Sequence, residues 1–145
     1  MLSDLRGVIP PISTPFDAQG NVVHAALAEI VEFQIAAGVH GLIPGGSTGE
    51  GHTFERDDFA RMFETVAKTN RGRLPLLAGL IVNSTQEAIM RGRIARDLGA
   101  QGLQVTPVHY LFKPDEEATL AHFRAVAEGT GLPILIYNVI PWNYL

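Results

Sequence analysis

Short apolar runs alternate with amphipathic segments along the whole chain, and this alternation constrains the fold more than any other feature. Five apolar runs indicate strands, at Val8–Pro15, Gly41–Pro44, Leu74–Leu80, Leu103–Thr106 and Leu132–Tyr137. The segments between them repeat apolar residues at helical spacing, at 25–37, around 59–66, at 84–98 and at 116–128. The strands are apolar throughout, as expected of parallel strands that helices cover on both faces. The pattern predicts an α/β fold with five strands and four helices.

Capping residues predict where several helices begin and end. Gly38 follows the segment 25–37, where a glycine C-cap is expected. Ser84 and Glu87 have the S-x-x-E spacing of a capping box, and Gly99 follows the end of that helix. Acidic residues interact favourably with the N-terminal end of a helix dipole, and they begin two further helices at Asp57-Asp58 and Asp115-Glu116-Glu117.

A weak internal repeat supports this order of elements. Residues 37–43 resemble residues 98–104, and residues 72–77 resemble residues 130–135, in each case about two βα units further along. Repetition at this period suits a (β/α)8 barrel, and a doubly wound open sheet fits it as well. Because no linker or low-complexity segment interrupts the pattern, residues 1–145 are expected to form part of one domain, with no second domain.

Composition and charge exclude several classes of function. Hydrophobic residues make up 46% of the chain and charged residues 18%, as in a folded globular protein. The net charge is −4 and the basic residues are scattered, which argues against nucleic acid or an anionic membrane as a partner. No apolar stretch approaches the roughly 18 residues of a membrane span, and the N-terminus has no signal-peptide pattern. With no cysteine in the sequence, the expected location is the cytoplasm.

The densest candidate for a binding site is the segment Gly45–Gly51, directly after the second predicted strand. Its four glycines let the backbone approach a ligand closely, and its two hydroxyl residues can donate hydrogen bonds. Such a loop favours an anion, either a phosphate or a carboxylate. It matches neither a P-loop nor a dinucleotide-binding fingerprint. The alternative is a flexible turn in which Thr48 or Thr53 caps the following helix.

Four ordered motifs resemble those of one enzyme family, the pyruvate-dependent class I aldolases that include dihydrodipicolinate synthase and N-acetylneuraminate lyase. Gly46-Ser47-Thr48-Gly49-Glu50 resembles the family's G-[ST]-T-G-E motif. The other three are Ile12–Phe16 with Gly20-Asn21, Val105-Thr106-Pro107, and Ile136–Val139 followed by Pro141. The similarity extends over essentially all 145 residues.

This resemblance implies a fold and an activity. The fold would be a (β/α)8 TIM barrel, of which residues 1–145 would form the N-terminal half, about four and a half βα units of an incomplete barrel. The activity would be that of a lyase or aldolase that forms a Schiff base with pyruvate or another 2-oxo acid. The family uses neither a metal nor an organic cofactor and commonly forms homotetramers, as dimers of dimers.

The resemblance also assigns roles to individual residues. Ser47 and Thr48, with the adjacent amide of Gly46, would bind the substrate carboxylate, and Glu50 would be a structural carboxylate bonded to loop amides. Tyr137 would relay protons, which suits a phenol with a reference pKa of about 10 if its neighbours polarise it. An isolated strand tyrosine is more commonly a core residue. Tyr137, however, ends a strand, and barrel active sites lie at the carboxyl ends of strands.

Some segments depart from the family pattern. The synthases have T-P-Y-Y where this chain has Thr106–Tyr110, so His109 takes the place of the second tyrosine and Tyr110 follows it. We therefore expect a proton relay at His109 and Tyr110 to be altered or absent. The segment Gly79–Asn83 also differs from the G-T-G-x-N of the synthases. These departures favour an aldolase, lyase or hydratase other than dihydrodipicolinate synthase itself.

The nucleophile is the main open question. Class I aldolases need a lysine whose amine is neutral and buried. Lys68 and Lys113 fall on a helix end and in a loop, where they are expected to be surface charges. In the family the Schiff-base lysine lies on the sixth strand, beyond Tyr137. The alternative function is therefore an inactive half-barrel that binds a carboxylate or serves in assembly. No metal site is expected, because the histidines lack ligand spacing.

Overall fold

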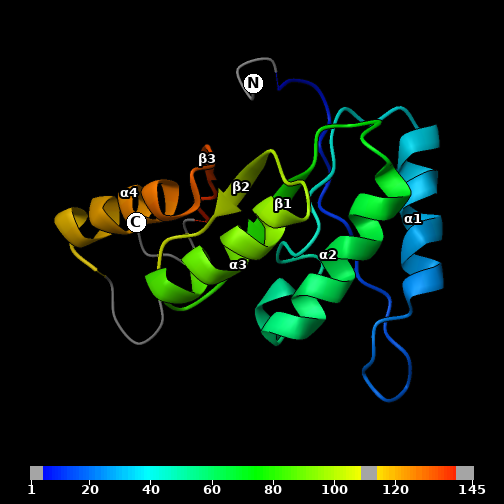
Figure 1. The fold of residues 1–145 in the computed structure, drawn as a ribbon, viewed down its shortest axis with the longest axis horizontal. Coiled ribbons are helices and arrows are strands. Elements are labelled where there is room, and N and C mark those ends of the chain that lie inside the picture. Colours follow the sequence, from blue (N-terminus) through cyan, green and yellow to red (C-terminus); the bar gives the residue numbers. More distant parts are fainter. Residues whose placement is uncertain (1–4, 109–113, 140–145) are drawn as a thin grey trace.

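The computed structural model describes residues 5–108 and 114–139 (Figure 1). Its helices are α1 (His24–Ala36), α2 (Arg56–Asn70), α3 (Thr85–Asp97) and α4 (Glu116–Thr130), with a short 3-10 turn, η2, at Gly51–Thr53. Its strands are β1 (Leu77–Leu80), β2 (Gly102–Val105) and β3 (Ile134–Ile136). They form a parallel sheet in the order β1-β2-β3, with Leu80 opposite Val105 and Val105 opposite Ile136. The predicted α/β alternation is confirmed.

The first two predicted strands do not form regular strands, so this part of the prediction is wrong in detail. They make only isolated parallel bridges, between Pro11 and Ile43 and between Leu42 and Leu76. The chain still runs as expected, because Ile12 N donates to Ile43 O at 2.9 Å and Leu77 N donates to Leu42 O at 2.9 Å. The interruption has a simple cause: proline has no N–H to donate, and Pro10, Pro11, Pro44 and Pro75 lie in or beside these ladders.

The predicted helix ends are largely confirmed. Gly38 and Gly99 follow α1 and α3 with φ angles of 79° and 98°, the left-handed backbone that glycine adopts most easily. Ser84 Oγ accepts from Glu87 N at 3.1 Å, so half of the predicted capping box forms. The other half does not, because the Glu87 carboxylate pairs with two arginines, Arg56 and Arg91, instead of the backbone.

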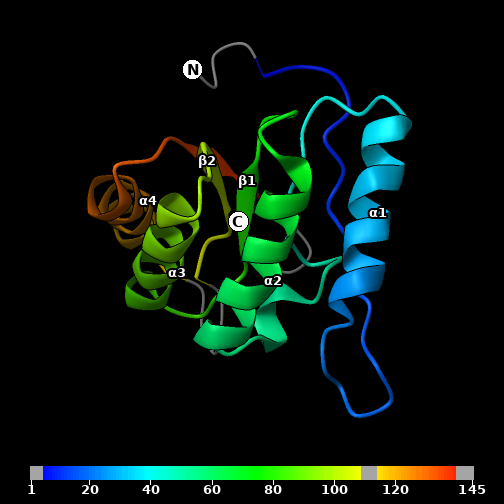
Figure 2. The same ribbon diagram turned by 45° about the vertical axis from the view of Figure 1, so that its right-hand side comes forward.

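The helices lie side by side in chain order from α1 to α4, along the strands (Figures 1 and 2). Alternate strand residues face them and form the main core, together with a buried stripe on α2 at the predicted positions: Ala78, Leu80, Leu103, Val105, Phe59, Met62, Phe63 and Val66. The residues between them in the register, Gly79, Gln104 and Leu135, form a row on the second face of the sheet. In the described part of the chain, no helix is long and apolar enough to cross a membrane.

Candidate active site

The candidate site is formed by two segments at the carboxyl ends of the strands, and β1 and β2 lie between the strands that they follow. The turn 45–51 comes after the bridge-forming segment 42–43, and Tyr137 follows β3. Tyr137 N donates to Val105 O at 2.8 Å, so the ladder between β2 and β3 continues through Tyr137. Since Tyr137 is two residues beyond Leu135, alternation places its side chain on the second face of the sheet, the face that carries Gln104.

Two glycines allow the turn to fold against β1 and against itself. A Cβ atom added to Gly79 would lie 2.4 Å from Gly46 N, and one added to Gly51 would lie 1.8 Å from Gly45 O. Any side chain at either position would therefore push the turn away from its place. Gly79 was not among the predicted site residues, although a glycine inside a strand is a known sign of close backbone approach.

Hydrogen bonds within the turn hold it in one conformation. Gly46 O accepts from both Gly49 N and Gly51 N at 3.1 Å, and the buried Thr14 Oγ1 donates to Gly49 O at 2.8 Å. Neither Thr48 nor Thr53 caps α2, whose N-cap residue is Glu55. The threonine cap of the alternative interpretation is therefore wrong.

The turn leaves a set of hydrogen-bond donors for a ligand. Within the described residues, the backbone N–H groups of Gly46, Ser47 and Thr48 donate to no acceptor. The side chain of Thr48 is exposed and that of Ser47 is half-buried. Successive N–H groups beside hydroxyls at a tight turn form a concavity that suits an anion. This arrangement is consistent with the carboxylate-binding role expected for these three residues.

The structure brings two of the predicted site residues together. Ser47 Oγ lies 3.2 Å from the hydroxyl oxygen of Tyr137, a hydrogen bond in which either atom can be the donor. Each hydroxyl has one proton and two lone pairs, so the proton of either group can join the pair. The arrangement can therefore bind an anion and pass a proton between two oxygens. The remaining predicted relay residues, His109 and Tyr110, lie outside the described residues.

The expectation for Glu50 is wrong. Its side chain is exposed, and its carboxylate accepts no hydrogen bond within residues 5–108 and 114–139. The amides of Gly49 and Gly51 donate to Gly46 O, and that of Glu50 donates to Ser47 O, so none of them bonds to the Glu50 carboxylate. Glu50 contributes through its backbone, because its carbonyl oxygen accepts from both Thr53 N and Thr53 Oγ1.

A buried arginine adjoins the turn and was not foreseen. Arg91 on α3 is 6% exposed and donates to the carbonyl oxygens of Gly51 and Phe54 and to the Glu87 carboxylate. The hydrogen bond from Arg56, with a smaller contribution from Arg91, holds the pKa of Glu87 below its usual range against the opposing effect of burial. The sequence contained one sign of this, the i,i+4 spacing of Glu87 and Arg91 on a helix.

A buried histidine connects the end of β2 to the start of α3. His122 Nε2 lies 3.1 Å from Thr106 O, and its Nδ1 lies 2.9 Å from Thr85 Oγ1. Since a carbonyl oxygen only accepts, the proton is on Nε2. Burial lowers the pKa of His122, and the hydrogen bond to Thr106 opposes this effect in part.

Residues 5–108 and 114–139 contain no group of acidic residues and histidines that could hold a metal ion.

The second face of the sheet carries one more polar side chain near the turn. Gln104 lies between Gly79 and Leu135 in the register. Its Oε1 atom is 3.6 Å from the position that a Cβ atom on Gly46 would occupy. Sequence reasoning missed Gln104, because a single polar residue in an apolar strand gives no sign of the face to which it belongs.

Parallel βα units with functional groups at the carboxyl ends of the strands are typical of (β/α)8-barrel enzymes, and the match to solved barrel structures shows that the arrangement here is about half of such a barrel. The chain belongs to the dihydrodipicolinate synthetase family, whose sequence model matches residues 4–141. It is 47% identical over 135 residues to 4-hydroxy-tetrahydrodipicolinate synthase of Phenylobacterium zucineum, covering 92% of this chain and 45% of that protein. The corresponding enzyme of Rhodospirillum centenum is 42% identical over 135 residues, with the same coverage.

Solved structures agree with this assignment. The chloride-inhibited dihydrodipicolinate synthase of Acinetobacter baumannii, complexed with pyruvate, matches with a TM-score of 0.91 at 32% identity, covering 96% of this chain and 47% of that one. Dihydrodipicolinate synthase from Bacillus anthracis matches with a TM-score of 0.89 at 31% identity, covering 96% and 48%. The chain thus spans about half the length of the relatives it matches.

Proposed function

We propose that this chain is the N-terminal half of a Schiff-base-forming lyase, of the class I aldolase type, that acts on pyruvate or another 2-oxo acid. The observation that carries the proposal is the hydrogen-bonded pair of Ser47 and Tyr137, 3.2 Å apart at the carboxyl ends of the strands, in a chain of this family. One member of the pair lies in the anion-binding turn, and the other is the proton donor and acceptor that the family motif implies.

The turn supplies the binding part of the reaction. The carboxylate of the 2-oxo acid accepts hydrogen bonds from the hydroxyls of Ser47 and Thr48 and from the unpaired N–H groups of residues 46–48. Charge-assisted hydrogen bonds of this kind are stronger than those between neutral groups. A carboxylate held there brings the adjacent oxo carbon towards the Tyr137 hydroxyl, which then passes protons to and from the reacting oxygen and carbon.

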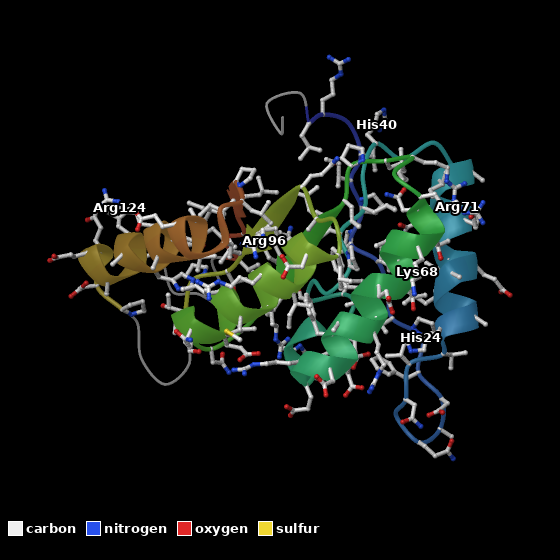
Figure 3. All side chains as sticks on the ribbon, in the orientation of Figure 1. His24, His40, Lys68, Arg71, Arg96 and Arg124 are labelled. Atoms are coloured by element: carbon white, nitrogen blue, oxygen red, sulfur yellow. The ribbon has the colours of Figure 1, made fainter. Side chains whose placement is uncertain are left out.

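The amine nucleophile is proposed to lie in the part of the enzyme that follows this sequence in its relatives. Lys68, on α2 (Figure 3), is 73% exposed and paired with Glu64 at 2.8 Å. An exposed side chain paired with a carboxylate is a surface charge and lacks the buried setting that a Schiff-base lysine needs. Lys113 lies outside the described residues. The cytoplasmic location and the homotetramer belong to the same proposal and rest on the family resemblance.

Two narrower forms of this function have specific support, and a third candidate is an alternative to it. The relatives named 4-hydroxy-tetrahydrodipicolinate synthase, 38–47% identical, favour that synthase reaction for the whole protein. The departures at His109 and in Gly79–Asn83 favour another lyase or hydratase of the family. The third candidate, an inactive half-barrel that binds a carboxylate or serves in assembly, follows if residues 1–145 act alone.

Borohydride reduction in the presence of pyruvate, followed by intact mass measurement, tests the proposal. We expect no adduct on the 145-residue chain, and one pyruvate adduct on a longer protein that begins with this sequence. An adduct on Lys68 or Lys113 would overturn our assignment of the nucleophile. A longer protein that forms no adduct would overturn the lyase assignment itself. Condensation with aspartate semialdehyde, compared with cleavage or dehydration of sugar-derived 2-oxo acids, then separates the synthase from other members of the family.

A further inference from the structure

We propose that Arg91 is a positioning residue that holds the carboxylate-binding turn in its active shape. The inference rests on the proposed function of residues 46–48, and it assigns a role to a side chain that lies on a helix and outside every motif of the resemblance. Arg91 is in the middle of α3, and it is buried although it carries a full charge. The side chains of Arg71 and Arg124 (Figure 3), by contrast, are exposed.

The guanidinium group of Arg91 bonds to two carbonyl groups at the far end of the turn. Nη1 donates to Gly51 O at 2.8 Å, and Nη2 donates to Phe54 O. These residues are 40 and 37 positions away in the sequence, so the bonds join α3 to the segment that leads from the turn into α2. The planar, forked arrangement of donors in arginine makes two such bonds possible from one side chain.

The bonded peptide leads directly to the binding residues. Gly51 N donates to Gly46 O at 3.1 Å, while Gly51 O accepts from Arg91. Gly46 is therefore held from one side through Gly51 and from the other side by its close packing on Gly79. The unpaired N–H groups of residues 46–48 begin at this held glycine. A shift of Gly51 would change the direction in which they point.

Packing alone does not account for a charge at this position. Burying an ion is costly unless it is paired and hydrogen-bonded, and an apolar side chain of similar volume often serves stability equally well. Arg91 is paired, since its Nε atom donates to Glu87 Oε1 at 2.9 Å, and its guanidinium lies 5.5 Å from the centre of the Phe59 ring. Arg56 holds the other carboxylate oxygen of Glu87. Glu87 thus orients the guanidinium, and the two remaining donor nitrogens face the turn.

The test compares three variants of the 145-residue chain. Arg91→Met keeps the apolar stem over Phe59 and removes the bonds to the turn. Arg91→Lys keeps the charge without the fork. Arg93→Met is the matched control, because Arg93 is on the same helix and donates to a carbonyl oxygen, that of Gly129 at 2.8 Å, but not to the turn. Amide hydrogen exchange at Gly49 and Gly51, and the pyruvate dissociation constant from NMR titration, are measured for each.

We expect Arg91→Met to raise the amide exchange rates of Gly49 and Gly51 by a factor about ten times larger than any rise in the exchange rates of α4. We also expect it to raise the dissociation constant of pyruvate about ten-fold. Arg93→Met should change neither quantity, and Arg91→Lys should fall between the two. Unchanged exchange in a folded Arg91→Met chain would overturn the inference. If that variant does not fold, Arg91→Lys decides on the same criterion. A wild-type chain that binds no pyruvate contradicts the proposed function instead, and the exchange rates still judge the role of Arg91.

Discussion

The hydroxyl oxygens of Ser47 and Tyr137 lie 3.2 Å apart, although 90 residues separate them in the sequence. Ser47 belongs to a turn that follows the second apolar run, and Tyr137 follows β3. Three parallel strands bring the two segments to one edge of the sheet, because the carboxyl ends of parallel strands all meet there. The pair joins a group that can bind a carboxylate to a group that can move a proton, and each of these tasks can be tested separately.

The binding task is tested by replacing the hydroxyl of Ser47. In the 145-residue chain, Ser47→Ala should weaken pyruvate binding about ten-fold, because a hydrogen bond to a charged group is lost. NMR titration measures the dissociation constant, with acetone as a ligand that lacks the carboxylate. Thr69→Ala is the matched control, since its hydroxyl donates to Thr65 O within α2, away from the site. Equal affinity in the Ser47→Ala and Thr69→Ala chains would show that Ser47 does not bind the carboxylate.

The proton-transfer task is tested at Tyr137. In a longer protein that begins with this sequence, Tyr137→Phe keeps the ring and removes the hydroxyl that bonds to Ser47. We expect kcat to fall about 100-fold or more, as is usual when a positioned acid or base is removed. Ser47→Ala in the same protein should instead raise KM more than it lowers kcat. A Tyr137→Phe enzyme with nearly normal kcat would exclude the tyrosine from proton transfer.

The sequence predicted these two residues because the glycine-rich turn and the tyrosine are part of local motifs, each a few residues long. The strands next to them were predicted less well. Pro10 and Pro11 lie in a continuous apolar run, yet their missing N–H groups reduce the first strand to isolated bridges. A hydrophobic pattern alone does not show whether the residues of a run have the N–H groups that strand pairing needs.

Arg91 and His122 could not be predicted, for a different reason. Both lie on helices, where polar residues are common. Each is buried only because other segments pack against its helix. Glu87 is marked as a partner of Arg91 by its i,i+4 spacing, but the other two partners are carbonyl groups, which every residue has and no sequence pattern marks. The partners of the Glu87 carboxylate could not be predicted either. Its capping-box spacing predicts a bond to the helix backbone, but Arg56 on α2 and Arg91 on α3 bind the carboxylate instead.

The close approach of β1 to the turn gives a prediction for stability. Gly79→Ala places a Cβ atom 2.4 Å from Gly46 N, where backbone has to move. We expect this variant to lower the free energy of unfolding by about 3 kcal/mol. Gly72→Ala is the control, because a Cβ atom there meets nothing within 4 Å and only its φ of +71° resists the change, a cost of about 1 kcal/mol. Urea unfolding measures both, and equal losses would contradict the packing argument.

The buried histidine predicts how stability depends on pH. In the unfolded chain His122 titrates near its ordinary pKa of 6.5, and in the folded chain burial lowers that pKa. The unfolded chain therefore binds the proton first as the pH falls. The contribution of neutral His122 is complete above pH 6.5 and is lost as the pH falls through the folded pKa. The surroundings are consistent with the neutral form, since Thr85 and Thr106 bond to the ring and the Phe123 ring lies 5.2 Å away.

His122→Gln should remove this part of the pH dependence. Glutamine keeps an N–H donor for Thr106 O but does not titrate, so the variant should be less stable than the wild type at pH 7.5 and approach it at pH 5. Urea unfolding across this range gives the difference in the free energy of unfolding at each pH. His24→Gln, at an exposed position with a hydrogen bond to Thr65 Oγ1 at 2.7 Å, is the matched control. A difference between the His122→Gln chain and the wild type that stays constant from pH 7.5 to pH 5 would mean that protonation of His122 does not oppose folding.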